Sequence, residues 1–171
     1  MALTQQFARI SVEHLALCRS SAEEVDRLCS FDGAPASDYR DLDWAGSPLL
    51  RVLELAGVDA DYLDTVRNAL AGREELNPNY RRHPDTILAH PITVTELSEV
   101  AQISKTLLEV DFQRALAALP ADADQARQAF DDQTSSLLCH PAEYLAPHLY
   151  TLRSFYIEAA QRRMAVVTWW D

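Results

Sequence analysis

The sequence predicts an α+β protein in which a small mixed sheet is covered by six or seven helices. Apolar residues recur at helical spacing in several stretches, and most of these stretches follow a good helix-capping residue. Three short apolar segments, near 6–10, 86–92 and 164–170, are predicted to be the strands. Because consecutive helices separate scattered strands, a regular βαβ repeat does not fit. With 171 residues and 48% hydrophobic content, we expect a single domain over residues 1–171.

The N-terminal part is predicted to form a strand followed by two helices. Phe7 and Ile10 mark the strand, and Ser11 is a favourable N-cap for the apolar stretch after it. Ser20 and Ser21 each stand three residues before a glutamate, which is the capping-box arrangement and predicts the second helix. Residues 30–48 collect glycine, proline, serine and aspartate without period, so a long loop is expected there.

A helical hairpin is predicted in the middle of the chain. The two segments 47–57 and 59–72 each have an N-terminal cap, an apolar face and a C-terminal glycine. Residues 73–86 contain two prolines and are predicted to be a loop before the strand near 86–92. Pro91 has no N–H to donate, which favours a strand end or an edge strand.

The clearest predicted helix follows that strand, with Thr93 as N-cap and Glu96 completing a capping box. A short exposed helix is expected to open at Asp122, and the last helix to run from about Pro141 to about residue 163. The final segment 164–170 carries β-branched and aromatic residues on both alternating faces, which is typical of a strand buried on both sides.

The segment LLCHPAEYLAPHLY resembles a metal or catalytic site because it groups Cys139, His140, Glu143 and His148. On a helix, His148 lies about 140° round from Glu143, and Pro147 interrupts the path, so these side chains are not expected to converge. Neither HExxH nor Glu-x-x-His is present. We therefore interpret His140 and Pro141 as the start of a helix and predict no metal here.

No cofactor and no structural zinc are predicted. The sequence lacks GxGxxG, GxxxxGK[ST] and GxSxG, and its four glycines leave little room for phosphate-binding loops. Cys18, Cys29 and Cys139 show no CxxC spacing, so neither a disulfide framework nor a zinc site is indicated.

The charge balance limits the partners that the protein can have. With 26 acidic and 15 basic residues, the formal net charge is −11, which repels nucleic acid and favours a basic protein partner. The chain shows no apolar run long enough for a membrane span and no signal peptide, so no membrane association and a cytoplasmic location are expected. The oligomeric state stays open.

Two loops contain candidate binding residues. The only compact basic cluster comprises Tyr80, Arg81, Arg82 and His83, and it is either a solvated loop or a contact for an anion or an acidic partner. In the 30–48 loop, the aromatic side chain of Trp44 must either be buried or bind something.

The C-terminal part of the chain contains a recognisable set of residues: Leu152, Phe155, Tyr156, Ala159, Ala160, Val166, Val167, Trp169 and Asp171. With weaker support from Leu42 and Asp43 and from Ile92, Thr93 and Glu96, this set resembles the bacterial YfbM-like family, a domain of unknown function. His90 stands where arginine is usual in that family. The resemblance implies a fold but no reaction, cofactor or substrate.

Two hypotheses about function follow. The first is a non-enzymatic protein-binding module, of the immunity or antitoxin kind, whose acidic surface meets a basic partner. The second is a small hydrolase or ligand-binding enzyme with its site around Asp43, Trp44, His90 and the 80–83 loop. The missing catalytic motifs and the net charge favour the first.

Overall fold

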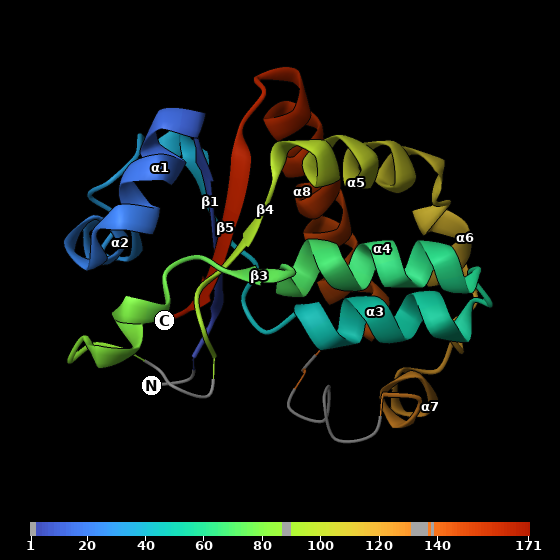
Figure 1. Cartoon of the computed structure of the whole chain (residues 1–171). Coiled ribbons are helices and arrows are strands. Elements are labelled where there is room, and N and C mark those ends of the chain that lie inside the picture. Colours follow the sequence, from blue (N-terminus) through green and yellow to red (C-terminus); the bar gives the residue numbers. More distant parts are fainter. Residues whose placement is uncertain (1–2, 87–89, 131–136, 138) are drawn as a thin grey trace.

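The structure is a computed structural model that describes residues 3–86, 90–130, 137 and 139–171. It confirms the predicted α+β class. The described strands form one five-stranded sheet in the order β2-β1-β5-β4-β3 (Figure 1). The strands are β1 Gln5–Ile10, β2 Tyr39–Asp41, β3 Glu74–Glu75, β4 Thr93–Thr95 and β5 Ala165–Trp170.

The sheet is antiparallel at every described pairing, so the predicted mixed sheet was wrong in this respect. Strands β1 and β5 come from the two ends of the chain and run side by side in opposite directions, with Gln5 opposite Trp170 and Ile10 opposite Ala165. Apolar spacing identifies strands but carries no information about their direction, which explains the error.

The two edge strands lie in segments that were predicted to be loops. β2 lies inside 30–48 and β3 inside 73–86, and both are short and largely polar. Short, charged edge strands protect a sheet against pairing with other chains, but they lack the alternation that marks a strand in a sequence. Polar edge strands are therefore the elements that the sequence analysis missed.

The strand predicted near 86–92 is displaced toward the C-terminus. The structure places β4 at Thr93–Thr95, while residues 87–89 of the predicted strand lie outside the described residues. Among the described residues of that predicted segment, Ile92 joins the sheet edge through its carbonyl, which accepts a hydrogen bond from Leu76 N (2.9 Å). Pro91 cannot donate to a ladder, so regular pairing begins after it.

The described chain contains eight α-helices, one more than the upper estimate. These are α1 Val12–Ser20, α2 Ala22–Cys29, α3 Gly46–Leu55, α4 Ala60–Ala71, α5 Leu97–Glu109, α6 Phe112–Ala117, α7 Ala123–Gln128 and α8 Pro141–Gln161. Two 3₁₀ turns, η1 Ala36–Asp38 and η2 Pro78–Arg82, complete the elements. None of the described helices combines the length and the apolar character that crossing a membrane requires.

Helix α5 begins three residues later than predicted, because Thr93 is part of β4 and does not cap the helix. The Thr93 hydroxyl instead donates to the carbonyl of Ala71, at the end of α4 (2.7 Å). The capping residue is Glu96, whose backbone N–H donates to the side chain of Glu99 (3.2 Å). Local sequence alone would make Thr93 the cap, but its place in β4 prevents this.

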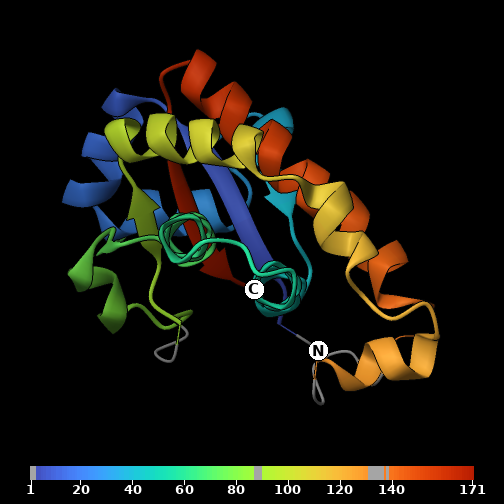
Figure 2. The same cartoon turned by 90° about the vertical axis from the view of Figure 1, so that its right-hand side faces the viewer.

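Helices cover both faces of the sheet. Figure 1 shows α1 and α2 on one side and α3, α4, α5 and α8 on the other, and Figure 2 shows α3 and α4 end-on in front of the second face. Successive strand residues alternate between the two cores, as the pleat requires. Phe7 and Val166 point into the larger core, whereas Ala8 and Val167 point into the smaller one under α1 and α2.

The position of β5 agrees with its predicted burial on both sides. It pairs with β1 along all six residues and with β4 on its other edge. Five of its six residues are buried, and Trp170 is half-buried where the strand leaves the sheet. The C-terminal end of this central strand therefore emerges from the core, and the candidate site lies there.

Candidate functional site

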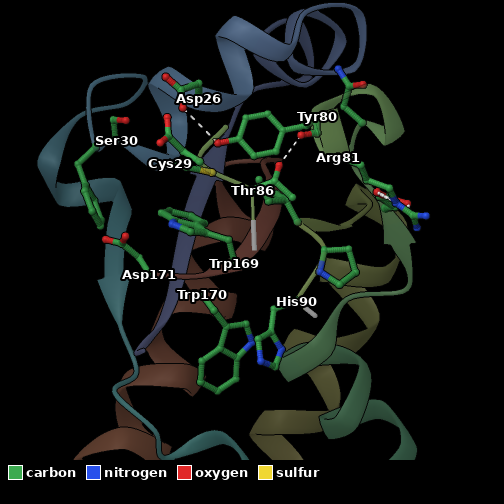
Figure 3. A pocket seen from close by; sticks show the side chains of 16 residues that line it. Asp26, Cys29, Ser30, Tyr80, Arg81, Thr86, His90, Trp169, Trp170 and Asp171 are labelled. Atoms are coloured by element: carbon green, nitrogen blue, oxygen red, sulfur yellow. Dashed lines mark hydrogen bonds and ion pairs between the residues drawn. The ribbon is translucent and has the colours of Figure 1, made fainter. Parts of the chain in front are cut away.

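A cavity of about 330 Å³ lies where α2, η2 and the C-terminal end of β5 meet (Figure 3). In that view Tyr80 and Asp26 are at the top, Trp170 and His90 face each other at the bottom, and Trp169 lies between. The lining residues are Asp26, Cys29, Ser30, Phe31, Glu75, Asn77, Tyr80, Arg81, Asp85, Thr86, His90, Pro91, Ile92, Trp169, Trp170 and Asp171.

Aromatic side chains form much of its wall. The ring of Phe31 lies 5.8 Å from that of Trp169, and the imidazole of His90 lies 5.1 Å from the ring of Trp170. Trp169 is only 3% exposed, yet its indole Nε1 has no hydrogen-bond partner among the described atoms. A buried N–H without a partner is costly, so Trp169 Nε1 is an unsatisfied donor in the wall of the cavity.

Hydrogen bonds hold the wall formed by η2 against α1 and α2. The Asn77 amide donates to the carbonyl of Cys18 (2.8 Å), and the Tyr80 hydroxyl donates to Asp26 Oδ1 (3.1 Å). Thr86 donates to the carbonyl of Tyr80. The Asn77 side chain also accepts from Asn79 N and so caps the 3₁₀ turn. These bonds fix a loop that apolar packing alone would leave poorly ordered.

The cavity carries an excess of negative charge. Its lining includes the four acidic residues Asp26, Glu75, Asp85 and Asp171 and one arginine. Arg81 is neutralised by Glu75, since its guanidinium donates to both carboxylate oxygens at 2.7 and 2.6 Å. Three carboxyl groups therefore remain without an arginine in the lining, and they favour a positively charged ligand.

The Cys29 thiol and the Tyr80 hydroxyl, next to the aromatic wall, hold their protons at neutral pH. Burial, followed by the nearby Cys18 and then Asp26 and Asp171, raises the pKa of the Cys29 thiol well above its usual value. Burial and the hydrogen bond to Asp26 also raise the pKa of Tyr80. A protonated thiol is a poor nucleophile, so this arrangement suits binding better than covalent catalysis.

The structure brings some of the predicted site residues together and separates others. Tyr80, Arg81 and His90 line the cavity. His83 stacks on the ring of Tyr80, with centroids 4.9 Å apart and an interplanar angle of 11°. Arg82 is exposed and does not line the cavity. Four of the five residues from this part of the prediction thus gather in one region.

Asp43 and Trp44 belong to a different cluster, which we name the Tyr144 cluster. Trp44 stacks on Tyr144 at 5.2 Å, Asp43 accepts a hydrogen bond from the Tyr144 hydroxyl (3.0 Å), and His148 lies 4.8 Å from the Tyr144 ring. None of these residues lines the cavity. The structure therefore does not bring Asp43 and Trp44 together with His90 and the 80–83 loop, because both residues contact Tyr144 of α8.

The CHPAEYLAPH motif performs the structural role that was predicted for its first half. His140 is the N-cap of α8, with its Nδ1 accepting from Ala142 N (3.1 Å), and Pro141 opens the helix. Pro147 was expected to interrupt the helix but lies inside continuous α8. Within the described ranges, His140, Glu143 and His148 form no metal-binding group.

Several lining residues were not singled out from the sequence. Asp26 and Cys29 lie on α2, where an acidic residue and a cysteine usually have structural roles. Trp169 was expected only as part of a buried strand. One signal was available, since two adjacent tryptophans at a strand end place one ring on each face of the sheet. The opposing residues come from distant parts of the chain, which no local pattern shows.

Fold and cavity together define this chain as an α+β protein with helices on both faces of an antiparallel sheet and a ligand-sized cavity at the end of its central strand. No protein-family model and no curated protein matches the sequence. The crystal structure of YfbM from Escherichia coli, a protein of unknown function, is similar, with a TM-score of 0.61. The similarity covers 98% of this chain and 99% of that chain, at 15% identity. The chain thus has a YfbM-like fold, as its C-terminal residues predicted.

Proposed function

We propose that this protein is a non-enzymatic binding module whose cavity receives a positively charged group from a basic partner. One observation carries the proposal: the carboxyl groups of Asp26, Asp85 and Asp171 surround an aromatic wall, and the only arginine in the lining is already paired. An arginine or lysine side chain of the partner would lie against the aromatic faces with its charge near the carboxylates.

The size and chemistry of the cavity support a side chain as its occupant. A volume of about 330 Å³ is at the lower end of that of small-ligand sites. The net charge of −11 attracts a basic protein over a longer range, while the aromatic rings add a short-range contribution of about 0.5–2 kcal/mol per cation contact. The three cysteines are free, which supports the expected cytoplasmic location.

A hydrolase has less support. Its predicted residues Asp43 and Trp44 lie in the Tyr144 cluster, and Cys29 and Tyr80 keep their protons in the cavity. A small molecule could enter the same space, but the surplus of carboxyl groups favours a cationic ligand over an anionic one.

Peptide titration tests the proposal. Tri-arginine, tri-lysine and tri-glutamate are added to the protein while the tryptophan fluorescence is followed, with Trp44→Phe as the background so that Trp169 and Trp170 report. We expect the two basic peptides to change the signal saturably and the acidic one to have no effect. Asp85→Asn should weaken binding about two- to fivefold, as the loss of an exposed charge contact predicts.

The matched control is Asp61→Asn, which removes the same charge from an exposed position on α4. It should bind the basic peptides as the parent does. Equal weakening by both substitutions would mean that only the net charge matters, and a lack of saturable binding by the parent protein would contradict the proposal.

A further inference from the structure

We propose that Asp26, His83 and Asp85 form a binding site for a divalent transition-metal ion at the wall of the cavity. The three side chains each offer one ligand atom, and these atoms lie within 4.8 Å of one another. His83 Nδ1 is 3.5 Å from Asp26 Oδ1 and 3.6 Å from Asp85 Oδ2. The site shares Asp26 and Asp85 with the cavity of the proposed function, but the proposal rests on separate observations and goes beyond that function.

The separations fit a shared ion. Two ligand atoms bound to zinc at 2.0–2.1 Å in a tetrahedron lie about 3.4 Å apart. The two measured separations, 3.5 and 3.6 Å, are therefore close to those of a formed site. Only small side-chain rotations would be needed to bring the three atoms onto one ion, since Asp85 is exposed and its side chain is free to turn.

A direct ion pair between His83 and the carboxylates explains the arrangement less well. A charge-assisted N–H···O bond is about 2.7–2.9 Å long, and both distances here are well beyond that. His83 Nδ1 is itself buried and has no hydrogen-bond partner among the described atoms. A buried ring nitrogen that faces two carboxylate oxygens without a hydrogen bond is a group that a shared metal ion would satisfy.

Neighbouring groups hold the ligands in place. Asp26 accepts a hydrogen bond from the Tyr80 hydroxyl (3.1 Å), and the His83 ring stacks on Tyr80. His83 is the C-cap of η2, and the Asn77 amide anchors that turn to α1. Such outer contacts orient metal ligands and raise affinity, so Tyr80 would serve two ligands at once.

The donor set selects the class of ion. One imidazole nitrogen with two carboxylate oxygens suits zinc, cobalt or manganese, whereas calcium and magnesium prefer oxygen alone. Three protein ligands leave at least one coordination position for water or a ligand group. Because Asp26 and Asp85 also line the cavity, the ion would lie at its wall.

The site differs from those considered in the sequence analysis. Residues 26 and 83 are 57 positions apart, so no local ligand spacing could reveal this site. It has three protein ligands and would bind an exchangeable ion, whereas the sequence analysis argued against a structural zinc site, which has four.

Cobalt titration of the chelator-treated full-length protein tests the proposal. We expect saturable visible absorption from bound Co²⁺. Zn²⁺ should displace the Co²⁺, whereas Mg²⁺ at the same concentration should not. Asp85→Asn and His83→Gln should each weaken Co²⁺ binding by about 100-fold or more. Loss of a residue that only supports a metal ligand already lowers affinity by about 10- to 100-fold, and these residues would be ligands themselves. Asp85 is exposed, so Asp85→Asn keeps the fold intact for this measurement.

His14→Gln is the matched control. His14 lies 4.0 Å from Glu24 and has a similar exposure, but it belongs to no three-ligand group within the described chain. This variant should bind Co²⁺ like the parent protein. Absence of saturable Co²⁺ binding by the parent, or equal binding by the parent and His83→Gln, would overturn the proposal. The peptide titration in metal-free protein is unaffected by either outcome.

Discussion

Arg9 shows how a single buried charge joins three elements. Its side chain is about 2% exposed, and its guanidinium contacts Asp38 at 3.1 Å, the carbonyl of Ser37 at 2.7 Å and the carboxylate of Glu158. Arg162, at the end of α8, binds the same Asp38 carboxylate. Asp38 thus links β1, η1 and α8. Without its carboxylate, the buried guanidinium of Arg9 would keep Glu158, which lies at the surface, as its charged partner.

Asp38→Asn is expected to destabilise the protein by about 3–5 kcal/mol at pH 7, because breaking a buried ion pair leaves an uncompensated charge. Urea unfolding followed by circular dichroism measures this. The matched control is Asp124→Asn, which breaks the exposed pair with Arg127 and should change stability by less than about 1 kcal/mol. If both substitutions lower the free energy of unfolding by the same small amount, the Asp38 carboxylate contributes little to stability.

The same residue predicts a pH dependence. Burial alone raises the pKa of Asp38, but the hydrogen bonds and charges of Arg162 and Arg9 outweigh it and hold this pKa below its usual value. Its stabilising contribution is therefore fully present above the ordinary aspartate pKa of about 3.9 and is lost as the pH falls through the lower pKa of the folded state. Stability measured between pH 7 and 3 should fall less steeply in Asp38→Asn than in the parent; parallel curves would contradict this.

At the scale of elements, α2 links the local sequence to the candidate site. Ser21 caps the helix by accepting from Glu24 N (3.3 Å), and the helix then carries Asp26 and Cys29 to the cavity. The sequence indicated Ser20 or Ser21 as the cap because the pattern is local, and the structure uses Ser21. By contrast, the cap of α5 was misplaced, because β4 uses Thr93 for the sheet.

Ser21→Ala should lower the free energy of unfolding by about 1 kcal/mol through the loss of the cap. Denaturant unfolding measures the change, and Ser20→Ala is the control, since Ser20 is exposed and precedes the cap. We expect less than about 0.5 kcal/mol for the control. If Ser21→Ala and Ser20→Ala unfold at the same denaturant concentration, the Ser21 hydroxyl does not stabilise α2.

At the scale of the whole molecule, β5 is the common support of both cores. Val166 packs in the larger core and Val167 and Trp169 in the smaller one, and the strand pairs on both edges. The sequence predicted this burial because both alternating faces are apolar. It could not show that Trp169 packs against Phe31 and lines a cavity together with Tyr80, since that requires residues 31, 80 and 169 to meet through the fold.

Removing residues 166–171 should abolish cooperative folding. Each large apolar side chain on β5 contributes about 1.5–3 kcal/mol when fully buried, and the whole domain is held by about 5–15 kcal/mol. Circular dichroism and thermal unfolding measure the loss, and deletion of Asp171 alone is the control that should still unfold cooperatively. A soluble, cooperatively folded protein lacking 166–171 would show that β5 is dispensable.

The central claim, that a cationic group enters the cavity at the end of β5, is tested most directly by the indole N–H resonances of the three tryptophans. Trp169 and Trp170 line the cavity, whereas Trp44 stacks on Tyr144 outside it. During titration with tri-arginine, the indole signals of Trp169 and Trp170 should shift saturably while that of Trp44 stays in place. Unchanged signals from Trp169 and Trp170, or a shift confined to Trp44, would contradict the account.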